Sequence, residues 1–335
     1  MIRIAVLGCG RIGVMHAANI AAHPRAALTA VFDINRAAAE AVAAQTGARV
    51  LESVAAILAA PDVDAVLIAS ATDTHADILE ACVAAGKPVL CEKPIDLSLA
   101  RVNACAAKIK DAPALIQLGF VRRFDPGHRA LQKAIVAGEI GDLHQVIITS
   151  RDPGLAPEAY LKVSGGIFRD MTIHDFDMAR FMLGEEPIEV IATGSRLVDP
   201  ALMARLGDVD TVTVVLKTAS GKQAIINNCR HASYGYDQRV EALGSKGMAL
   251  SENRRAHGLT LHTADYTERA EPLLYFFIER YREAFDAEID AFVDAIEKGT
   301  SPEVGFEDGR LALVLAEAAM KSMAEGRVIR ISEVC

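Results

Sequence analysis

The chain has 335 residues, a length that favours two domains over one. Hydrophobic residues make up 51% and charged residues 24%, which is typical of a folded globular protein and excludes disorder as the main state. The formal net charge is −9, with no dense run of lysine and arginine, so we do not expect a nucleic-acid partner. No uncharged stretch reaches the roughly 18 apolar residues of a membrane helix, so we expect no membrane contact.

The cysteines give no sign of a disulfide framework. None of them forms a Cys-x-x-Cys pair, and in a chain of this length scattered cysteines predict reduced thiols and a cytoplasmic location. The apolar run at the N-terminus, Ile2–Leu7, is too short for a signal peptide and leads directly into a glycine-rich turn. The six cysteines are Cys9, Cys82, Cys91, Cys105, Cys229 and Cys335.

The first 120 residues alternate short apolar runs with alanine-rich helical stretches. This alternation predicts a parallel, doubly wound sheet with helices between the strands. The predicted strands are Ile2–Leu7, Leu28–Phe32, Ala65–Ala69, Val89–Cys91 and Leu115–Phe120, and the predicted helices are Val14–Ala22, Arg36–Thr46 and His75–Ala85.

The pattern changes after Phe120, where successive β-branched runs follow one another without intervening helices. Such runs predict a mostly antiparallel sheet. The predicted strands are His144–Thr149, Ile188–Thr193, Thr211–Leu216, Gln223–Asn228 and Arg239–Leu243, and the predicted helices are Asp125–Ala137, Met171–Leu183, Ala284–Lys298 and Glu307–Glu325. The sequence thus predicts an α/β domain over residues 1–120 and an α+β domain over residues 121–335.

The segment Gly8-Cys9-Gly10-Arg11-Ile12-Gly13 follows a predicted strand and opens a predicted helix. Glycines at this spacing allow a tight turn and let the backbone approach a pyrophosphate placed on the helix N-terminus. We therefore predict a dinucleotide-binding loop, with a glycine turn of another α/β fold as the alternative.

Asp33 ends the next predicted strand, about twenty residues further on, as the dinucleotide-binding fingerprint requires. A carboxylate there accepts hydrogen bonds from the adenosine ribose hydroxyls and repels a 2′-phosphate, so the sequence favours NAD. Arg36 lies nearby and could bind such a phosphate, which keeps NADP open.

Two further segments follow predicted strands, where ligands of open α/β sheets bind. The first is Ala69–His75; its Asp73 and Thr74 also suit a helix cap, and its histidine is more typical of a helix start than of a catalyst. The second is Cys91-Glu92-Lys93-Pro94, whose lysine would project toward a nicotinamide and polarise a substrate oxygen.

Asp170 and His174 stand four residues apart, so a helix would place them on one face. The oxidation of an alcohol needs a base, and a histidine oriented by a carboxylate is suited to that task. The alternative is a polar helix face with a capping aspartate. Zinc could be imagined among Asp170, His174, Asp175 and Asp177, but no Cys/His pair at ligand spacing supports it, so we predict no metal.

Four segments together resemble the glucose-fructose oxidoreductase/inositol dehydrogenase family: GCGRIG, ATDTH, CEKP and GGIFRDMTIHDFDMAR. The resemblance covers almost the full length. Within the family, the segments GFVRRFDPGH, TSRDPG, RDMTIHDFDMARFMLGEEP and YGYDQRVEALGSKG resemble inositol 2-dehydrogenases.

The resemblance implies an N-terminal Rossmann domain, an open and mostly antiparallel C-terminal sheet, and a homotetramer assembled through the open sheets. It also implies NAD as cofactor, a small polyol as substrate and Lys93, Asp170 and His174 as the catalytic group. The residues expected to bind the cofactor are Gly8, Gly10, Arg11, Ile12, Gly13, Asp33, Ser70, Thr72, His75, Glu92 and Lys93.

One departure concerns the substrate. Better-known inositol dehydrogenases carry a histidine and an asparagine beside the arginine that matches Arg151, where this chain has Ser150 and Asp152. Both can bond hydroxyl groups, but the departure leaves the preferred stereoisomer open. The resemblance implies oxidation of myo-inositol or a close isomer to a ketoinositol. The expected substrate contacts, besides the catalytic group, are Arg122, Asp152 and Tyr236, with a cofactor or interdomain salt bridge as the alternative role of the arginine.

Two other functions compete with this expectation. The first is dehydrogenation of another sugar or polyol, such as an aldose at C1. The second is a regulator that binds a dinucleotide without turnover. A regulator has no need of Lys93, Asp170 and His174 together, so their joint presence favours an enzyme.

Overall fold

The computed structural model describes residues 1–110, 112 and 114–334, and the chain divides into two compact units. Unit 1 comprises Met1–Val121 and Ala284–Leu313, and unit 2 comprises Arg122–Glu283 and Val314–Cys335. Cys335, which the sequence analysis counted among the reduced thiols, lies outside the described residues.

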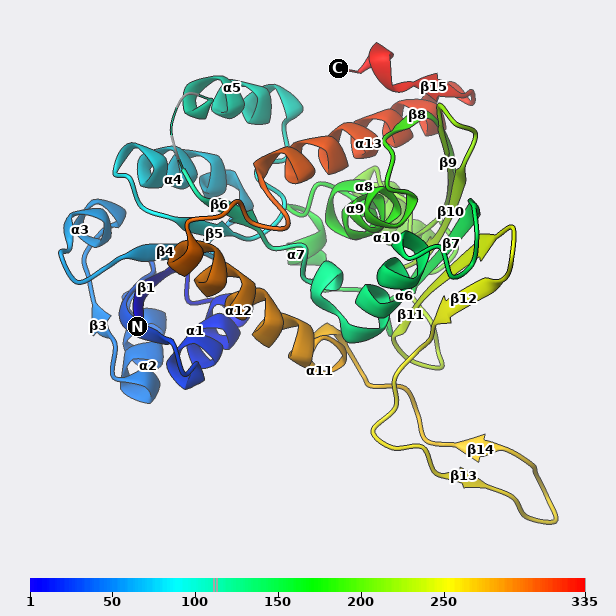
Figure 1. Cartoon of the computed structure of the whole chain (residues 1–335), viewed down its shortest axis with the longest axis horizontal. Helices are drawn as coiled ribbons and strands as arrows, with labels where there is room; N and C mark the ends of the chain where they lie inside the picture. The colour runs from blue at the N-terminus through cyan, green and yellow to red at the C-terminus, as the bar shows by residue number, and fades with distance from the viewer. Residues whose placement is uncertain (111, 113, 335) are drawn as a thin grey trace. The chain divides into compact units, whose positions relative to one another are not determined.

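Unit 1 is built on a six-stranded parallel sheet in the order β3-β2-β1-β4-β5-β6 (Figure 1). Its central strands are almost entirely apolar because helices cover both faces, and Ile4 to Leu7 are fully buried. The strands are β1 Ile2–Leu7, β2 Ala26–Phe32, β3 Arg49–Val50, β4 Ala65–Ile68, β5 Val89–Cys91 and β6 Ile116–Leu118.

The helices of unit 1 join successive strands, as right-handed parallel connections require. They are α1 Arg11–Ala22, α2 Arg36–Thr46, α3 Val54–Ala59, α4 Thr72–Ala84 and α5 Leu99–Ile109. Strand order reverses at β1, whose two neighbours are β2 and β4, so the carboxyl ends of β1 and β4 form the point where ligands of such sheets bind.

Unit 1 also takes up a late part of the chain, which corrects the predicted boundary. Helix α12, Arg282–Lys298, places Ile289, Phe292 and Val293 in the same apolar core as Ile4 and Val6. These three residues share one face of the helix, and that face is buried within unit 1. Residues 284–313 therefore belong with the N-terminal unit, not with the second domain as the sequence pattern indicated.

Unit 2 contains a seven-stranded sheet in the order β12-β11-β7-β10-β9-β8-β15. All neighbouring pairs are antiparallel except β7 and β10, which run parallel, so the sheet is mostly antiparallel, as predicted. The strands are β7 Leu143–Arg151, β8 Pro187–Ser195, β9 Thr211–Thr218, β10 Gln223–Cys229, β11 Asp237–Gly244, β12 Met248–Ser251 and β15 Ile329–Arg330.

Helices of unit 2 cover one face of this sheet (Figure 1). Helix α9 packs against β7 and β10, and α6 packs against β11 and β12. The helices are η1 Val121–Phe124, α6 Pro126–Val136, α7 Glu158–Leu161, α8 Ile167–Asp170, α9 Thr172–Leu183, α10 Pro200–Leu206, α11 Phe277–Arg280 and η2 Ile331–Glu333. Helix α13, Phe306–Glu325, begins in unit 1 and ends in unit 2.

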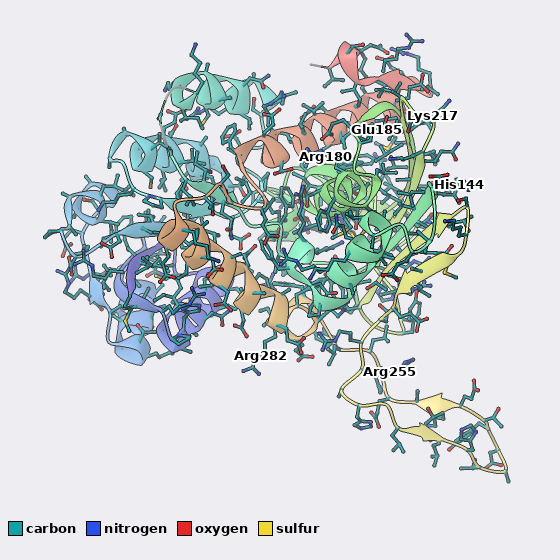
Figure 2. All side chains as sticks on the ribbon, viewed as in Figure 1. His144, Arg180, Glu185, Lys217, Arg255 and Arg282 are labelled. Atoms are coloured by element: carbon teal, nitrogen blue, oxygen red, sulfur yellow. The ribbon has the colours of Figure 1, made fainter. Side chains whose placement is uncertain are left out.

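The opposite face of the unit 2 sheet is open. Ile191, Val215, Ile225 and Ile147 lie in register on four adjacent strands and form an apolar row across this face. Their neighbours along each strand, such as Val214, are buried against the helices. Figure 2 shows Lys217 of β9 projecting from the sheet into solvent.

A hairpin of short strands, β13 Thr260–Leu261 and β14 Arg269–Ala270, projects from unit 2 (Figure 1). Arg255 lies at its base (Figure 2), where its Nε donates to the carbonyl of Glu271 at 2.7 Å. Among the described residues, no helix is both long enough and apolar enough to cross a lipid bilayer.

Candidate functional site

The loop from β1 to α1 has room for a ligand and no room for side chains at two of its glycines. Gly8 has φ +97°, and a Cβ there would lie 2.4 Å from the carbonyl oxygen of Ala69. A Cβ on Gly13 would lie 1.9 Å from the Gly8 carbonyl oxygen, whereas one on Gly10 would meet no atom within 4 Å. The open space lies at the N-terminus of α1, where Gly10 provides no side-chain cap, and a helix N-terminus suits a pyrophosphate.

Asp33 follows β2 and is tied to this loop. Its Oδ2 accepts the Cys9 N–H at 2.6 Å and its Oδ1 accepts the Asn35 N–H at 2.7 Å. Each carboxylate oxygen keeps capacity for a ribose hydroxyl. Arg36, the alternative phosphate ligand, is engaged by Glu40 at 2.8 Å and Glu52 at 2.9 Å. The arrangement therefore fits an unphosphorylated ribose.

The segment after β4 is held by hydrogen bonds of its own. The hydroxyls of Ser70 and Thr74 lie 2.7 Å apart, and Thr72 begins α4. Because the Gly8 loop approaches Ala69, the residues after β1 and β4 adjoin each other. Arg11 and Ile12 lie in the first turn of α1, beside the same loop. The cofactor contacts of these residues remain predictions.

His75 connects two loops of unit 1. It is 2% exposed; its Nδ1 lies 2.8 Å from the Pro94 carbonyl oxygen and its Nε2 lies 3.1 Å from the Ser70 carbonyl oxygen. A carbonyl oxygen can only accept, so both bonds form together only when both ring nitrogens carry protons. Both ring nitrogens of His75 thus lie at hydrogen-bond distance from backbone carbonyl oxygens. A contact between His75 and the cofactor remains a prediction.

Glu92 and Lys93 follow β5. One oxygen of Glu92 lies 2.8 Å from Nε2 of His16, and the other accepts the Lys93 N–H at 3.3 Å. Burial would raise the pKa of Glu92, but the His16 hydrogen bond, with the charges of His16, Lys93 and His75, holds that pKa below its usual value. The lysine is half-buried and stands at the sheet edge that carries the glycine loop.

Asp170 is the best-anchored member of the predicted catalytic group in unit 2. Its Oδ1 accepts the Tyr160 hydroxyl at 2.6 Å, and its Oδ2 accepts Nη1 of Arg230 at 2.9 Å. It ends α8, whereas His174 lies in the first turn of α9, and Met171 separates the helices. The expected single helix carrying both residues is therefore interrupted between them.

Asp152 follows β7 and is half-buried. Burial raises its pKa to about 7; the charge of Arg230 opposes that rise and the charge of Asp170 adds to it. Near neutral pH the carboxyl group therefore exists in both protonation states. It can accept a hydrogen bond from a hydroxyl group or donate one to it, which suits a polyol site.

Arg122 forms a salt bridge within unit 2, and not the interdomain salt bridge that the sequence offered as an alternative. Its Nη1 donates to Oδ1 of Asp175 at 2.6 Å, and its Nη2 donates to Oγ of Ser150 at 3.2 Å. Asn228 donates to the other Asp175 oxygen at 2.8 Å. The Ser150 hydroxyl donates in turn to Gln238 at 3.0 Å and is fully buried, so its bonds are made inside the protein. Substrate binding by Arg122 remains a prediction.

Tyr236, the other predicted substrate contact, is only 4% exposed. Its ring meets Phe276 and Tyr281 edge to face at 5.3 and 6.2 Å between centroids. Burial raises its hydroxyl pKa well above the usual value, so the group stays protonated and can donate a hydrogen bond. A contact between Tyr236 and the substrate remains a prediction.

Several side chains that form hydrogen bonds to the predicted site residues were not identified from the sequence. His16 is fully buried and lies at hydrogen-bond distance from Glu92, 76 residues away in the sequence, and no local motif marked it. Arg230 and Tyr160 anchor Asp170, and no local motif marked either of them. Arg230 follows β10, and the parallel pairing of β10 with β7 places Cys229 opposite Arg151, so knowledge of the strand order would have found it.

Comparisons with known proteins agree over the whole chain. Residues 2–120 match the oxidoreductase family with an NAD-binding Rossmann fold, and residues 128–250 match the GFO/IDH/MocA C-terminal domain. The chain is 52% identical to inositol 2-dehydrogenase of Rhizobium meliloti over 99% of both chains. It is 44% identical to myo-inositol 2-dehydrogenase of Thermotoga maritima, again over 99% of both.

A solved structure gives the same result. Scyllo-inositol dehydrogenase of Lactobacillus casei, with bound NAD(H) and scyllo-inositol, has a TM-score of 0.92 and 30% identity, covering 99% of each chain. The glycine loop, the Rossmann sheet and the mixed C-terminal sheet are thus accounted for by one known protein family. This chain belongs to the GFO/IDH/MocA family of oxidoreductases.

Proposed function

We propose that this protein is an NAD-dependent inositol dehydrogenase that oxidises one ring hydroxyl of myo-inositol, or of a close isomer, to a ketone. The observation that carries the proposal is the edge of the unit 1 sheet, where the glycine loop, the Ser70–His75 segment and Lys93 follow β1, β4 and β5. A dinucleotide cradle beside a lysine is suited to hydride transfer from an alcohol. Full-length similarity to inositol dehydrogenases supports inositol as the substrate.

NAD would be held by the glycine loop and Asp33, with Ser70, Thr72 and Glu92 nearby, and would supply the hydride acceptor. The negative charge of Asp33, with the capacity of its oxygens to accept ribose hydroxyls, supports NAD over NADP. The complete set proposed to contact it is Gly8, Gly10, Arg11, Ile12, Gly13, Asp33, Ser70, Thr72, His75, Glu92 and Lys93.

The protein's own residues supply the acid–base chemistry. His174 takes the proton of the reacting hydroxyl group. The hydrogen on the same carbon leaves as hydride, with both electrons of the C–H bond, and is accepted by the cofactor. The products are therefore a ketone, reduced cofactor and a proton on the histidine. The Lys93 ammonium polarises the reacting oxygen. Asp170, anchored by Tyr160 and Arg230, helps to orient the histidine and can bond a neighbouring hydroxyl.

Asp152, Arg122 and Tyr236 are proposed to recognise the remaining hydroxyls of the substrate. Asp152 supplies a carboxyl group that donates or accepts near pH 7. Arg122 is held by Asp175, and Tyr236 offers a protonated hydroxyl. The related enzymes include one named for myo-inositol and one named for scyllo-inositol. The preferred isomer of this protein is therefore a separate question from the class of substrate.

The protein is further proposed to work in the cytoplasm as a homotetramer, with a small molecule as its only substrate partner. The open face of the unit 2 sheet supports self-association, because an apolar row that reaches across four strands is stabilised when a second sheet covers it. The described cysteines, which include Cys9 and Cys82, form no disulfides, and this supports a reducing compartment.

The test is turnover of NAD and of NADP with myo-, scyllo- and chiro-inositol, glucose and xylose. We expect an inositol with NAD to give the highest kcat/KM.

Lys93→Ala should lower kcat strongly at nearly unchanged NAD affinity. His174→Ala should lower the rate about 10²–10⁴-fold at neutral pH, with partial recovery at high pH. An aldose as the best substrate would replace inositol in the proposal.

Two further outcomes would contradict the proposal. Tight NAD binding without turnover of any of these substrates would favour a regulator. Loss of activity on dialysis against a strong chelator, restored specifically by zinc, would contradict the metal-free chemistry assigned to His174. Lys87→Ala is a matched control for the lysine, because Lys87 donates to the carbonyl of Val63 and lies outside the proposed site.

A further inference from the structure

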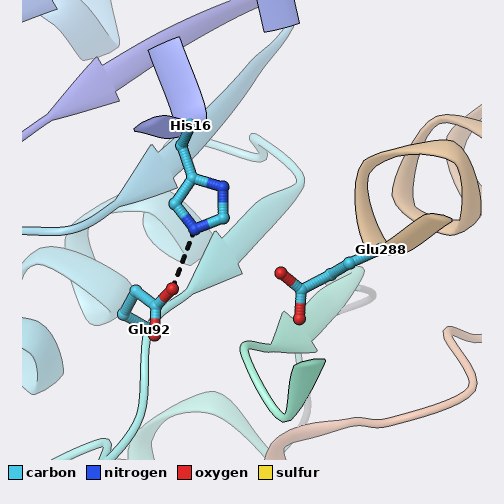
Figure 3. Close-up of side chains that lie close together, drawn as sticks. All are labelled: His16, Glu92 and Glu288. Atoms are coloured by element: carbon cyan, nitrogen blue, oxygen red, sulfur yellow. Dashed lines mark hydrogen bonds and ion pairs between the residues drawn. The ribbon is translucent and has the colours of Figure 1, made fainter. Parts of the chain in front are cut away.

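Three side chains from distant parts of the sequence meet inside unit 1, next to Lys93. They are His16 of α1, Glu92 after β5 and Glu288 of α12, and one nitrogen or oxygen atom of each lies within 4.8 Å of the others (Figure 3). His16 and Glu288 are fully buried, and the side chain of Glu92 is 14% exposed. Two carboxyl groups and an imidazole therefore share one buried pocket.

The two carboxyl groups have very different surroundings. Glu92 is bonded by His16 and by the Lys93 N–H. Neither carboxyl oxygen of Glu288 has a hydrogen-bond partner among the described residues, although Figure 3 shows the group pointing toward the other two side chains. The position of Glu288 is itself fixed, because its backbone carbonyl accepts the Gln117 side-chain N–H at 2.9 Å.

Charge decides the protonation of the pair. A buried carboxylate without a partner is strongly disfavoured and takes up a proton instead. Burial raises the pKa of Glu288 well above its usual value, and the charge of Glu92 raises it further. Glu92 keeps its charge because His16, Lys93 and His75 stabilise it. The pair thus holds one ionised and one neutral carboxyl group, as coupled carboxylates commonly do.

A metal ion could also balance two carboxylates, but the histidine argues against it. A metal-bound histidine almost always donates its second N–H to an acceptor. Nδ1 of His16 is buried with no acceptor among the described residues, while Nε2 lies at hydrogen-bond distance from Glu92. The pocket is therefore better suited to a proton on Glu288 than to a metal ion.

We propose that Glu288 is a positioning residue that acts as a neutral acid near neutral pH, leaving Glu92 as the single negative charge beside Lys93. This role rests on the proposed function, in which Lys93 polarises the reacting oxygen. The titratable groups that lie beside Glu288 are His16 from α1 and Glu92 after β5, while the charges of Lys93 and of His75 in α4 act on Glu92. Ionisation of Glu288 would repel Glu92 and disturb its bond to the Lys93 backbone.

The first test measures folding and needs no turnover. Unfolding of the full-length protein by urea is compared for the wild type and Glu288→Gln at pH 5, 6 and 7. A group whose pKa is raised by folding stabilises the protein below its unfolded pKa and loses that effect as pH rises toward the folded value. The folding constant of Glu288→Gln relative to wild type should therefore rise about tenfold per pH unit. Asp286→Asn, an exposed carboxylate on the same helix, is the matched control and should give a constant ratio.

The second test measures activity. Glu288→Gln should keep kcat within about threefold at neutral pH and stay active to higher pH than the wild type, because glutamine cannot ionise. Glu288→Ala should lower kcat at unchanged KM for the polyol. A pH-independent folding ratio would contradict the neutral acid, and so would binding of Zn²⁺ to the wild type but not to the Gln variant.

The two tests separate this inference from the proposed function. If the wild type turned over no inositol, the proposed function and the positioning role would both be wrong, while the folding ratio would still decide whether Glu288 is protonated. If turnover were normal and the ratio flat, only the role of Glu288 would be wrong. Because the Gln variant is nearly isosteric, its outcome does not depend on whether Glu288→Ala folds.

Discussion

Single carboxyl groups in this protein differ mainly in what donates to them. Asp33 accepts hydrogen bonds from two backbone N–H groups, and Asp170 accepts hydrogen bonds from a tyrosine and an arginine. For Asp152, the nearby positive charge does not offset the loss of water around the carboxyl group, so its pKa reaches about 7. The same side chain therefore serves as a ribose ligand, an anchor or a titrating group according to its neighbours. The next two predictions follow from these differences.

Asp33→Ser should shift cofactor preference toward NADP. The serine loses charge-assisted hydrogen bonds to the ribose hydroxyls, worth about 1.5–3 kcal/mol, and no longer repels a 2′-phosphate. The exposed pairs of Arg36 with Glu40 and Glu52 are weak enough for the arginine to turn to that phosphate. The measurement is the ratio of kcat/KM with the two cofactors. An unchanged ratio would mean that Asp33 does not contact the ribose.

Asp152→Asn should remove a titration step near pH 7 from the pH profile of kcat/KM and raise the KM for the polyol about tenfold, the effect of one hydrogen bond. The raised pKa of Asp152 also determines whether this carboxyl group stabilises or destabilises the fold as pH rises. The carboxyl group stabilises the fold below about pH 4, its unfolded pKa, and loses that effect as pH rises through 7, so the variant gains stability relative to wild type over this range. A wild-type step near pH 7 that persists in the variant would belong to another group.

At the scale of elements, adjacent arginines connect η1 to α9. Arg122 bonds Asp175, and Arg123 donates to both oxygens of Asp177 at 2.8 and 2.5 Å, with all four side chains buried. Bidentate geometry and burial distinguish this contact from surface ion pairs, which contribute little. The start of unit 2 is thereby held against the helix that carries His174.

Asp177→Ala should lower the free energy of unfolding by about 3–5 kcal/mol, because it leaves the Arg123 charge buried without this partner. Thermal or urea unfolding measures the loss. Glu189→Ala, at a half-buried position on β8, is the control and should change stability little. A loss below about 1 kcal/mol would show that other contacts hold the arginine.

Elements with a strong local pattern were predicted from sequence, and elements defined by distant partners were not. The strand Ile2–Leu7 and the helix Arg36–Thr46 match the structure residue for residue. Strand β3 has only Arg49 and Val50, too few for any periodicity. The glycine loop, Asp33 and Lys93 are marked by motif and spacing. His16 and Glu288, like Arg230, act through residues far away in sequence, and no local pattern reports such contacts.

At the scale of the whole molecule, the open face of the unit 2 sheet bears on assembly. Ile225→Glu places a charge in the middle of the apolar row, opposite Val215 and Ile147. If this face joins subunits, the variant should dissociate at concentrations where the wild type is tetrameric, because a buried unpaired charge is strongly unfavourable. Sedimentation velocity measures the mass. Lys217→Glu, on the same face but already polar, is the control, and an unchanged mass for Ile225→Glu would place the interface elsewhere.

Unit 1 is discontinuous in sequence, and this affects how the protein is made. A ribosome releases the first 121 residues long before it reaches α12, yet Ile289, Phe292 and Val293 complete the core that Ile4 and Val6 begin. Until then the nascent Rossmann sheet carries an uncovered apolar surface, which favours chaperone binding or aggregation. A gene fragment that stops at residue 121 would encode the cofactor motifs without a complete core. The fragment that folds alone would instead need residues 284–313 fused to it in place of unit 2.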